Sequence, residues 1–130
     1  MTQKNYEIVL YKEALEDLKK IENYIVVKFY NPIAANRVSE KIHKTIENIL
    51  PFPYAYPLVD VKRVKKYNIR KTVCGKYLIF FRVVRHTVEI IGVFYSRRLL
   101  KNVYDELILG QNQKGTNEDY LNKRGVTMRL

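Results

Sequence analysis

Three strand-like segments joined by two short turns occupy residues 67–95, and this pattern constrains the fold more than any other part of the chain. The segments read YNIRKTV (67–73), KYLIFFRVV (76–84) and VEIIGVFY (88–95). The dipeptides Cys74–Gly75 and Arg85–His86 separate them. Because so few residues join neighbouring segments, each pair is expected to form an antiparallel hairpin. The sequence therefore predicts a three-stranded meander.

The middle segment is apolar on both of its faces. Tyr77, Ile79 and Phe81 would lie on one face of a strand, because side chains alternate along it. Leu78 and Phe80 would lie on the other face. We therefore expect this strand at the centre of the sheet, covered on both faces for part of its length.

Two amphipathic helices are predicted before the meander, at residues 12–29 and 32–50. Their apolar residues recur at three- and four-residue steps. The stripes are Leu15, Leu18, Ile21, Ile25 and Phe29 in the first helix, and Ala35, Val38, Ile42, Ile46 and Ile49 in the second. Asn31 is a good N-cap and Pro32 a good first helical residue. The link between the helices is so short that an antiparallel helical hairpin is expected.

The remaining segments complete an α+β pattern. Residues 5–11 alternate and predict a first strand. Three prolines near the start of residues 51–66 predict an extended, rigid loop. Leu99, Leu100, Val103 and Leu107 favour a short third helix that ends at Gly110.

The predicted order is β-α-α-β-β-β(-α), with the N-terminal helical hairpin packed on a small, mostly antiparallel sheet and all helices on one face of that sheet. Residues 1–110 would form one domain. Residues 111–130 are polar and weakly patterned, and we expect a tail that is flexible or depends on a partner for its order.

Positive charge is concentrated in one part of the chain. The net charge is +11, and the stretch VKRVKKYNIRK at residues 61–71 carries six basic residues and no acid. Between Asp60 and Glu89 there are nine basic residues and again no acid. This asymmetry favours a polyanion or an acidic protein as the partner.

Several classes of protein do not fit the sequence. Cys74 is the only cysteine, which excludes an intramolecular disulfide. His43 and His86 stand apart from any cysteine, so no zinc site is expected, and no cofactor motif is found. The N-terminus does not resemble a signal peptide, and apolar runs fall short of a membrane span. We therefore expect a cytoplasmic protein.

The order of these segments resembles that of the RelE/ParE superfamily, the toxins of type II toxin–antitoxin (plasmid stabilisation) modules. ALEDLKKIENYI is similar to the first helix of the family, and KIHKTIENILPFPYAYP to the end of its second helix and the following loop. YNIRKTVCGKYLIFFRVVRHTVEIIGVFYSRR is similar to its sheet. The resemblance covers roughly residues 5–109. The long paired helices and FFRVVRHTVEIIGVFY are more similar to ParE than to RelE.

The resemblance implies one of two mechanisms. RelE-type members are ribosome-dependent mRNA endonucleases, whereas ParE-type members lack the nuclease residues and poison DNA gyrase. Both kinds are held inactive by a small, usually acidic antitoxin. The resemblance therefore implies a toxin–antitoxin complex, and either the ribosome with its mRNA or DNA gyrase as the target.

Three residues match functional positions of RelE. Arg70 stands where RelE has a catalytic lysine, Arg98 lies close to a phosphate-binding arginine, and Tyr104 matches a tyrosine on the C-terminal helix. Two positions depart from the pattern, because Asn68 replaces a lysine and Tyr77 an arginine. Metal-independent RNA cleavage needs a general base, and an arginine is a poor one because it stays protonated. The nuclease set is therefore incomplete.

The sequence leaves two main hypotheses and a third, more remote one. The incomplete nuclease set and the helical hairpin slightly favour a ParE-like toxin that acts on gyrase and is not an enzyme. The alternative is a RelE-like nuclease, for which the density of basic residues is the main argument. The residues expected to contact nucleic acid are then Lys62, Arg63, Lys65, Lys66, Lys71, Lys76 and Arg97. The remote third hypothesis is a non-toxic nucleic-acid-binding domain, which lacks a recognisable recognition helix.

Overall fold

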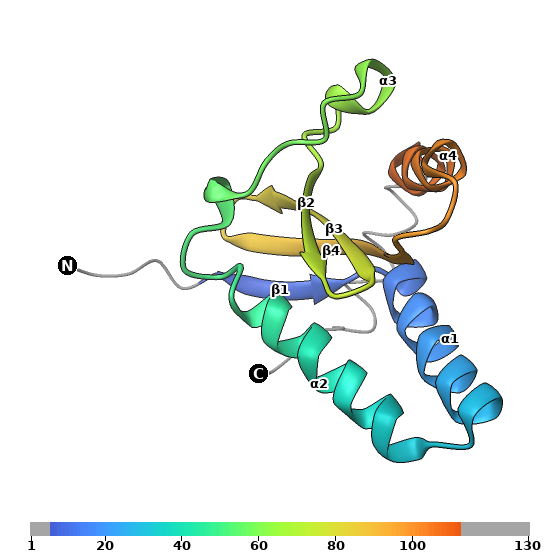
Figure 1. Ribbon diagram of the computed structural model, residues 1–130. Helices are drawn as coiled ribbons and strands as arrows, with labels where there is room; N and C mark the ends of the chain where they lie inside the picture. Colours follow the sequence, from blue (N-terminus) through green and yellow to red (C-terminus); the bar gives the residue numbers. More distant parts are fainter. Residues whose placement is uncertain (1–5, 113–130) are drawn as a thin grey trace.

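A computed structural model describes residues 6–112 of the 130-residue chain, and its elements confirm the predicted α+β class (Figure 1). In chain order they are β1 (Glu7–Leu10), α1 (Lys12–Phe29), α2 (Pro32–Glu47), a 3₁₀ turn η1 (Pro53–Ala55), α3 (Lys62–Lys65), β2 (Arg70–Cys74), β3 (Tyr77–Val84), β4 (Thr87–Tyr95) and α4 (Leu100–Asn112). Beyond Asn112, the predicted tail lies outside the described residues.

The four strands form one sheet in the order β1-β4-β3-β2. β2, β3 and β4 pair antiparallel, which confirms the predicted meander. β1 lies parallel to β4, with Ile8 opposite Val88. Because β1 joins the sheet beside β4, the two central strands are β3 and β4. β4 is the more deeply buried of the two, from Val88 to Phe94.

Helices cover both faces of the sheet, so the prediction that they lie on one face is wrong. The hairpin of α1 and α2 packs on the first face, where Leu18 and Ile46 meet Phe81 and Ile90. α4 and α3 pack on the second face, and their core centres on Phe80. Figure 1 shows the sheet between these two layers. The alternation of β3 requires this arrangement, because Phe80 and Phe81 are both fully buried on opposite faces.

The helical hairpin begins and ends close to the predicted residues. The side-chain oxygen of Asn31 accepts a hydrogen bond from the backbone N–H of Ala34 at 3.0 Å, which confirms the N-cap. Pro32 is the first residue of α2. One member of the predicted apolar stripe, Phe29, is 60% exposed, because the end of α1 extends past the sheet.

A β-bulge lies in β4 close to the contact of this strand with α1. Phe80 pairs with Gly92 and Phe81 with Ile90, so Ile91 is an extra residue in β4. Just after the bulge, the backbone N–H of Val93 donates a hydrogen bond to the Asp17 carboxylate on α1 at 3.0 Å.

Several element boundaries differ from the predictions, and β2 begins at Arg70 rather than at Tyr67. α2 ends at Glu47, and a turn follows it up to Pro51. The predicted extended loop contains η1 and the single helical turn α3. α4 continues past Gly110, because Gln111 is buried against the sheet and accepts a hydrogen bond from Arg82.

Candidate functional site

Arg70 lies on the first face of the sheet and holds the proline-rich loop. It pairs with Phe81 across β2 and β3, so the two side chains share a face. Its Nη1 donates hydrogen bonds to the carbonyl oxygens of Tyr56 at 2.6 Å and Tyr54 at 3.3 Å. Its guanidinium also lies 5.2 Å from the centre of the Tyr54 ring. These contacts give Arg70 a structural role.

Tyr104 lies on the second face. Its ring makes an edge contact with Phe80, with 6.5 Å between the ring centres, and its side chain belongs to the core beneath α4. Phe80 and Phe81 are consecutive residues of β3 that point to opposite faces of the sheet. Arg70 and Tyr104 are therefore separated by the sheet, and the structure does not bring them together.

Arg98 lies on the same face as Tyr104. Its guanidinium donates two hydrogen bonds to the Glu106 carboxylate, at 2.9 and 3.2 Å. It also lies 5.2 Å from the centre of the Phe94 ring. The Phe94 ring in turn contacts Phe80, which contacts Tyr104. The structure thus places Arg98 and Tyr104 around one aromatic cluster, with the charge of Arg98 already paired.

The basic residues around α3 are partly engaged within the protein. Arg63 forms an ion pair with Asp105 and donates a hydrogen bond to the Lys101 carbonyl oxygen at 3.0 Å, which ties α3 to α4. Lys65 lies 3.5 Å from the Asp60 carboxylate. Lys66 lies over the ring of Tyr67, 5.2 Å from its centre.

The other predicted nucleic-acid contacts are divided between the two ends of β2. Lys62 is exposed on α3, and Lys71 is half-buried on the second face beside the start of β2. Lys76 and Arg97 are exposed at the far end, where the Ser96 backbone N–H donates to the Lys76 carbonyl oxygen at 2.7 Å. The predicted contacts therefore do not form a single compact cluster.

A buried polar network, which the sequence did not predict, lies beneath the C-terminal end of α4. The Tyr11 hydroxyl donates a hydrogen bond to Glu89 at 2.8 Å, and Arg82 lies 3.8 Å from the same carboxylate oxygen. Arg82 also donates to Gln111. Burial, with the nearby Glu89 charge, raises the pKa of Tyr11 well above its usual range. The one signal in the sequence was Glu89, an acid inside an apolar strand.

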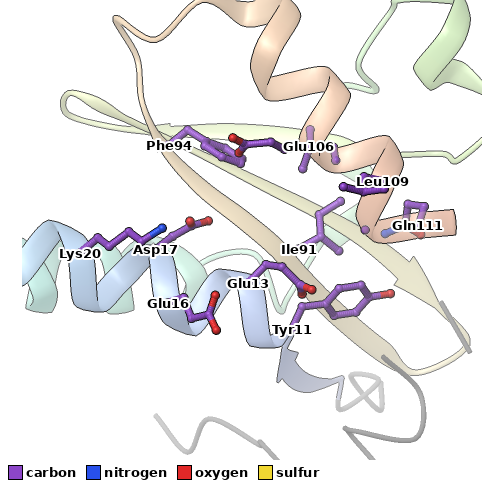
Figure 2. A pocket seen from close by; sticks show the side chains of 12 residues that line it. Tyr11, Glu13, Glu16, Asp17, Lys20, Ile91, Phe94, Glu106, Leu109 and Gln111 are labelled. Atoms are coloured by element: carbon purple, nitrogen blue, oxygen red, sulfur yellow. The ribbon is translucent and has the colours of Figure 1, made fainter. Parts of the chain in front are cut away.

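An acidic cleft of about 220 Å³ lies between α1 and α4 (Figure 2). Glu13, Glu16 and Asp17 line it from α1, and Glu106 lines it from α4. Burial raises the pKa of Asp17 to about 6. The cleft is negatively charged although the protein is strongly basic, so its charge opposes the binding of a phosphate backbone.

A larger groove of about 700 Å³ runs between α1 and the ends of β3 and β4. Aromatic side chains of Tyr24, Phe29, Tyr77, Phe94 and Tyr95 line it. Four basic residues, Lys20, Lys28, Lys76 and Arg98, also line it, together with Asp17 and Glu106. Glu106 is paired with Arg98, so the three lysines and Asp17 set the remaining charge of the groove, which is positive.

Two further observations bear on the function. Residues 6–112 contain no group of three or more His, Cys, Asp or Glu side chains that could hold a metal ion. Within the same range, no helix is long and apolar enough to span a membrane.

Residues 8–100 match the sequence model of a family described as the ParE toxin of the type II toxin–antitoxin system parDE. The chain belongs to the ParE toxin family. This confirms the superfamily inferred from the sequence and its association with toxin–antitoxin systems. No curated protein sequence matches the chain.

A solved structure confirms the ParE-like fold. It is described as the chromosomal ParDE toxin–antitoxin system from P. aeruginosa. The match has a TM-score of 0.59 and covers 72% of this chain and 98% of the other, at 15% sequence identity. At this identity the match establishes the fold alone.

Proposed function

We propose that this ParE-family toxin arrests growth by binding a protein target, with DNA gyrase as that target, and that it does not cleave RNA. A small acidic antitoxin would neutralise it in a toxin–antitoxin complex. Membership of the ParE family supports the general role, and the geometry of the predicted nuclease residues supports the choice of mechanism.

The observation that carries the proposal is the separation of Arg70 from Tyr104 by the sheet. A nuclease needs its base, its phosphate-binding cations and its acid around one scissile phosphate. Arg70 binds two carbonyl oxygens of the proline-rich loop, and Arg98 is paired with Glu106. Both guanidinium groups are thus already engaged within the protein, Arg70 through Nη1 and Arg98 through both Nη atoms.

The histidines of the chain do not supply the missing base. His43 lies on α2, and His86 lies in the turn between β3 and β4, beside Tyr6. Arg98 follows the opposite end of β4, whose nine residues span roughly 26 Å at the usual rise of a strand. His86 and Arg98 therefore cannot act on one phosphate.

The larger groove supports an antitoxin as the neutralising partner. Its aromatic lining would accept the apolar face of an amphipathic helix, and Lys20, Lys28 and Lys76 would face acidic side chains of that helix.

The proposal is tested with purified protein in two parallel assays. We expect inhibition of DNA supercoiling by gyrase, relieved by the antitoxin, and no cleavage of mRNA on translating ribosomes in a toeprinting assay. Ribosome-dependent cleavage without any effect on gyrase would overturn the proposal and favour a RelE-like mechanism.

A further inference from the structure

The end of the helical hairpin carries a set of exposed apolar side chains. Tyr24, Val27, Phe29, Tyr30 and Ile33 are each more than half exposed, and we call this set the hairpin tip. It surrounds the connection between α1 and α2, which Figure 1 shows far from the sheet. Large apolar side chains gathered at one exposed place are unusual in a soluble domain and are typical of contact surfaces.

The charge of the hairpin tip is entirely positive. Residues 23–37 contain Lys28 and Arg37 and no acid. The Lys28 ammonium donates a hydrogen bond to the Tyr24 hydroxyl at 2.7 Å. It also lies 5.1 Å from the centre of the Tyr24 ring and 5.9 Å from that of Phe29. The cation and the two rings therefore form one ordered surface.

The backbone of Tyr30 adds an independent observation. Tyr30 follows α1 in the left-handed conformation, with φ 49° and ψ 38°. Glycine or asparagine usually occupies this position, because a side chain with a Cβ atom is strained there. The Tyr30 side chain is 89% exposed, so packing within the described residues does not offset the strain. Folding alone gives no reason for a tyrosine here, whereas a contact with another molecule does.

We propose that the hairpin tip is the surface through which the toxin contacts its protein target, and that the target presents an acidic patch around an apolar pocket. Tyrosine and phenylalanine are common anchors of protein interfaces. Lys28 and Arg37 would pair with the acids around such a pocket. This inference rests on the proposed function, because it assumes a protein target.

Charge separates this target from a second copy of the chain. A symmetric contact between two hairpin tips would bring Lys28 and Arg37 of one copy close to the same residues of the other. Like charges oppose each other across an interface, and no acid in residues 23–37 would compensate. An acidic partner would instead attract Lys28 and Arg37.

Replacing the strained tyrosine separates folding from binding. Tyr30→Gly removes the exposed ring and relieves the backbone strain, so the unfolding temperature should equal or exceed that of the wild type. We expect growth arrest after brief expression to weaken at least tenfold in the inducer dose it requires. Phe29→Ser should behave alike, while Phe52→Ser, which removes a similarly exposed ring on the proline-rich loop, should leave growth arrest unchanged.

Four readouts decide between the outcomes. Growth arrest tests the hairpin tip whatever the target is, whereas gyrase supercoiling tests the identity of the target, so either can fail alone. Full growth arrest in Tyr30→Gly and Phe29→Ser would overturn the inference. Phe29 also lines the larger groove, so the antitoxin readout uses Tyr30→Gly alone. Loss of antitoxin binding by Tyr30→Gly would assign the hairpin tip to the antitoxin and overturn the inference. If the wild type binds anionic phospholipid vesicles and both variants lose that binding, the hairpin tip is a membrane contact and the inference is again overturned.

Discussion

The Asp17 carboxylate on α1 accepts a hydrogen bond from the backbone N–H of Val93, which lies in β4 beyond Ile90, the last residue of β4 that pairs with β1. This contact joins the first helix to the most buried strand of the sheet. It also places a carboxylate between the acidic cleft and the larger groove, since Asp17 lines both.

Asp17 should make stability depend on pH. Its pKa is raised to about 6 by burial, so the folded state binds a proton more tightly than the unfolded state does. The free energy of unfolding should therefore fall by on the order of 2 kcal/mol as pH rises from about 4 to about 6. Above that range, Asp17 should cause no further change in it.

Urea unfolding of the wild type and of Asp17→Asn between pH 4 and 8 checks this prediction. The asparagine side chain can still accept the hydrogen bond from Val93, but it does not titrate. The difference in unfolding free energy between the two proteins should change across the window from pH 4 to 6. Glu16→Gln, on the exposed side of the same helix, is the control and should show no comparable change.

Gly92 should not tolerate a larger residue. A Cβ atom at this position would lie 2.5 Å from Cε2 of Phe94 and 3.3 Å from Cδ2 of Leu107. Gly92→Ala should therefore displace the Phe94 ring and loosen α4, at a cost of about 1–3 kcal/mol in unfolding free energy. Thermal unfolding measures this cost.

Gly110→Ala is the matched control, because a Cβ atom there meets nothing within 4 Å. It lies inside α4, where alanine is favoured over glycine by up to about 1 kcal/mol. The two alanine variants should thus shift the unfolding temperature in opposite directions. Equal effects would contradict the close packing of α4 on Gly92.

The buried network should depend more on Arg82 than on Tyr11. Tyr11→Phe removes one hydrogen bond to Glu89, which should cost about 1–2 kcal/mol. Arg82→Met leaves Glu89 buried without its positive partner and also frees Gln111, so the loss should be larger, roughly 3 kcal/mol. Chemical denaturation compares the two variants. A larger effect of Tyr11→Phe would contradict this ranking.

The local elements of the fold could be predicted because their signals are local. The apolar period of α1, the Asn31–Pro32 start of α2 and the two short turns of the meander each involve only a few neighbouring residues. The position of β1 beside β4 could not be predicted, because it joins residues eighty positions apart. The spacing of Phe29 continues the apolar stripe and so predicts burial, but periodicity does not show where a helix passes the edge of a sheet.

The candidate site was less predictable than the fold. The resemblance matched Arg70, Arg98 and Tyr104 to functional positions along the chain. The direction and contacts of each side chain depend on its face of the sheet and on its neighbours, which a match along the chain does not give. Arg70 lies one residue from the buried Ile69, and this single step places it on the face opposite Tyr104. The exposure of the hairpin tip could not be predicted either, because Tyr30 belongs to no periodic pattern.

Tyr104→Phe gives the sharpest test between the two mechanisms. The proposed function assigns the Tyr104 ring to packing against Phe80, and phenylalanine retains that ring. We therefore expect growth arrest, antitoxin binding and gyrase inhibition within about twofold of the wild type, and an unfolding free energy lower by at most about 1 kcal/mol. A nuclease that uses the hydroxyl would instead lose its activity by about two orders of magnitude or more.

Arg70→Lys completes the comparison, because lysine restores the residue type of RelE but lacks the planar guanidinium that lies over the Tyr54 ring. It should destabilise the proline-rich loop without adding ribosome-dependent cleavage, and the appearance of such cleavage would favour a nuclease site on the first face of the sheet.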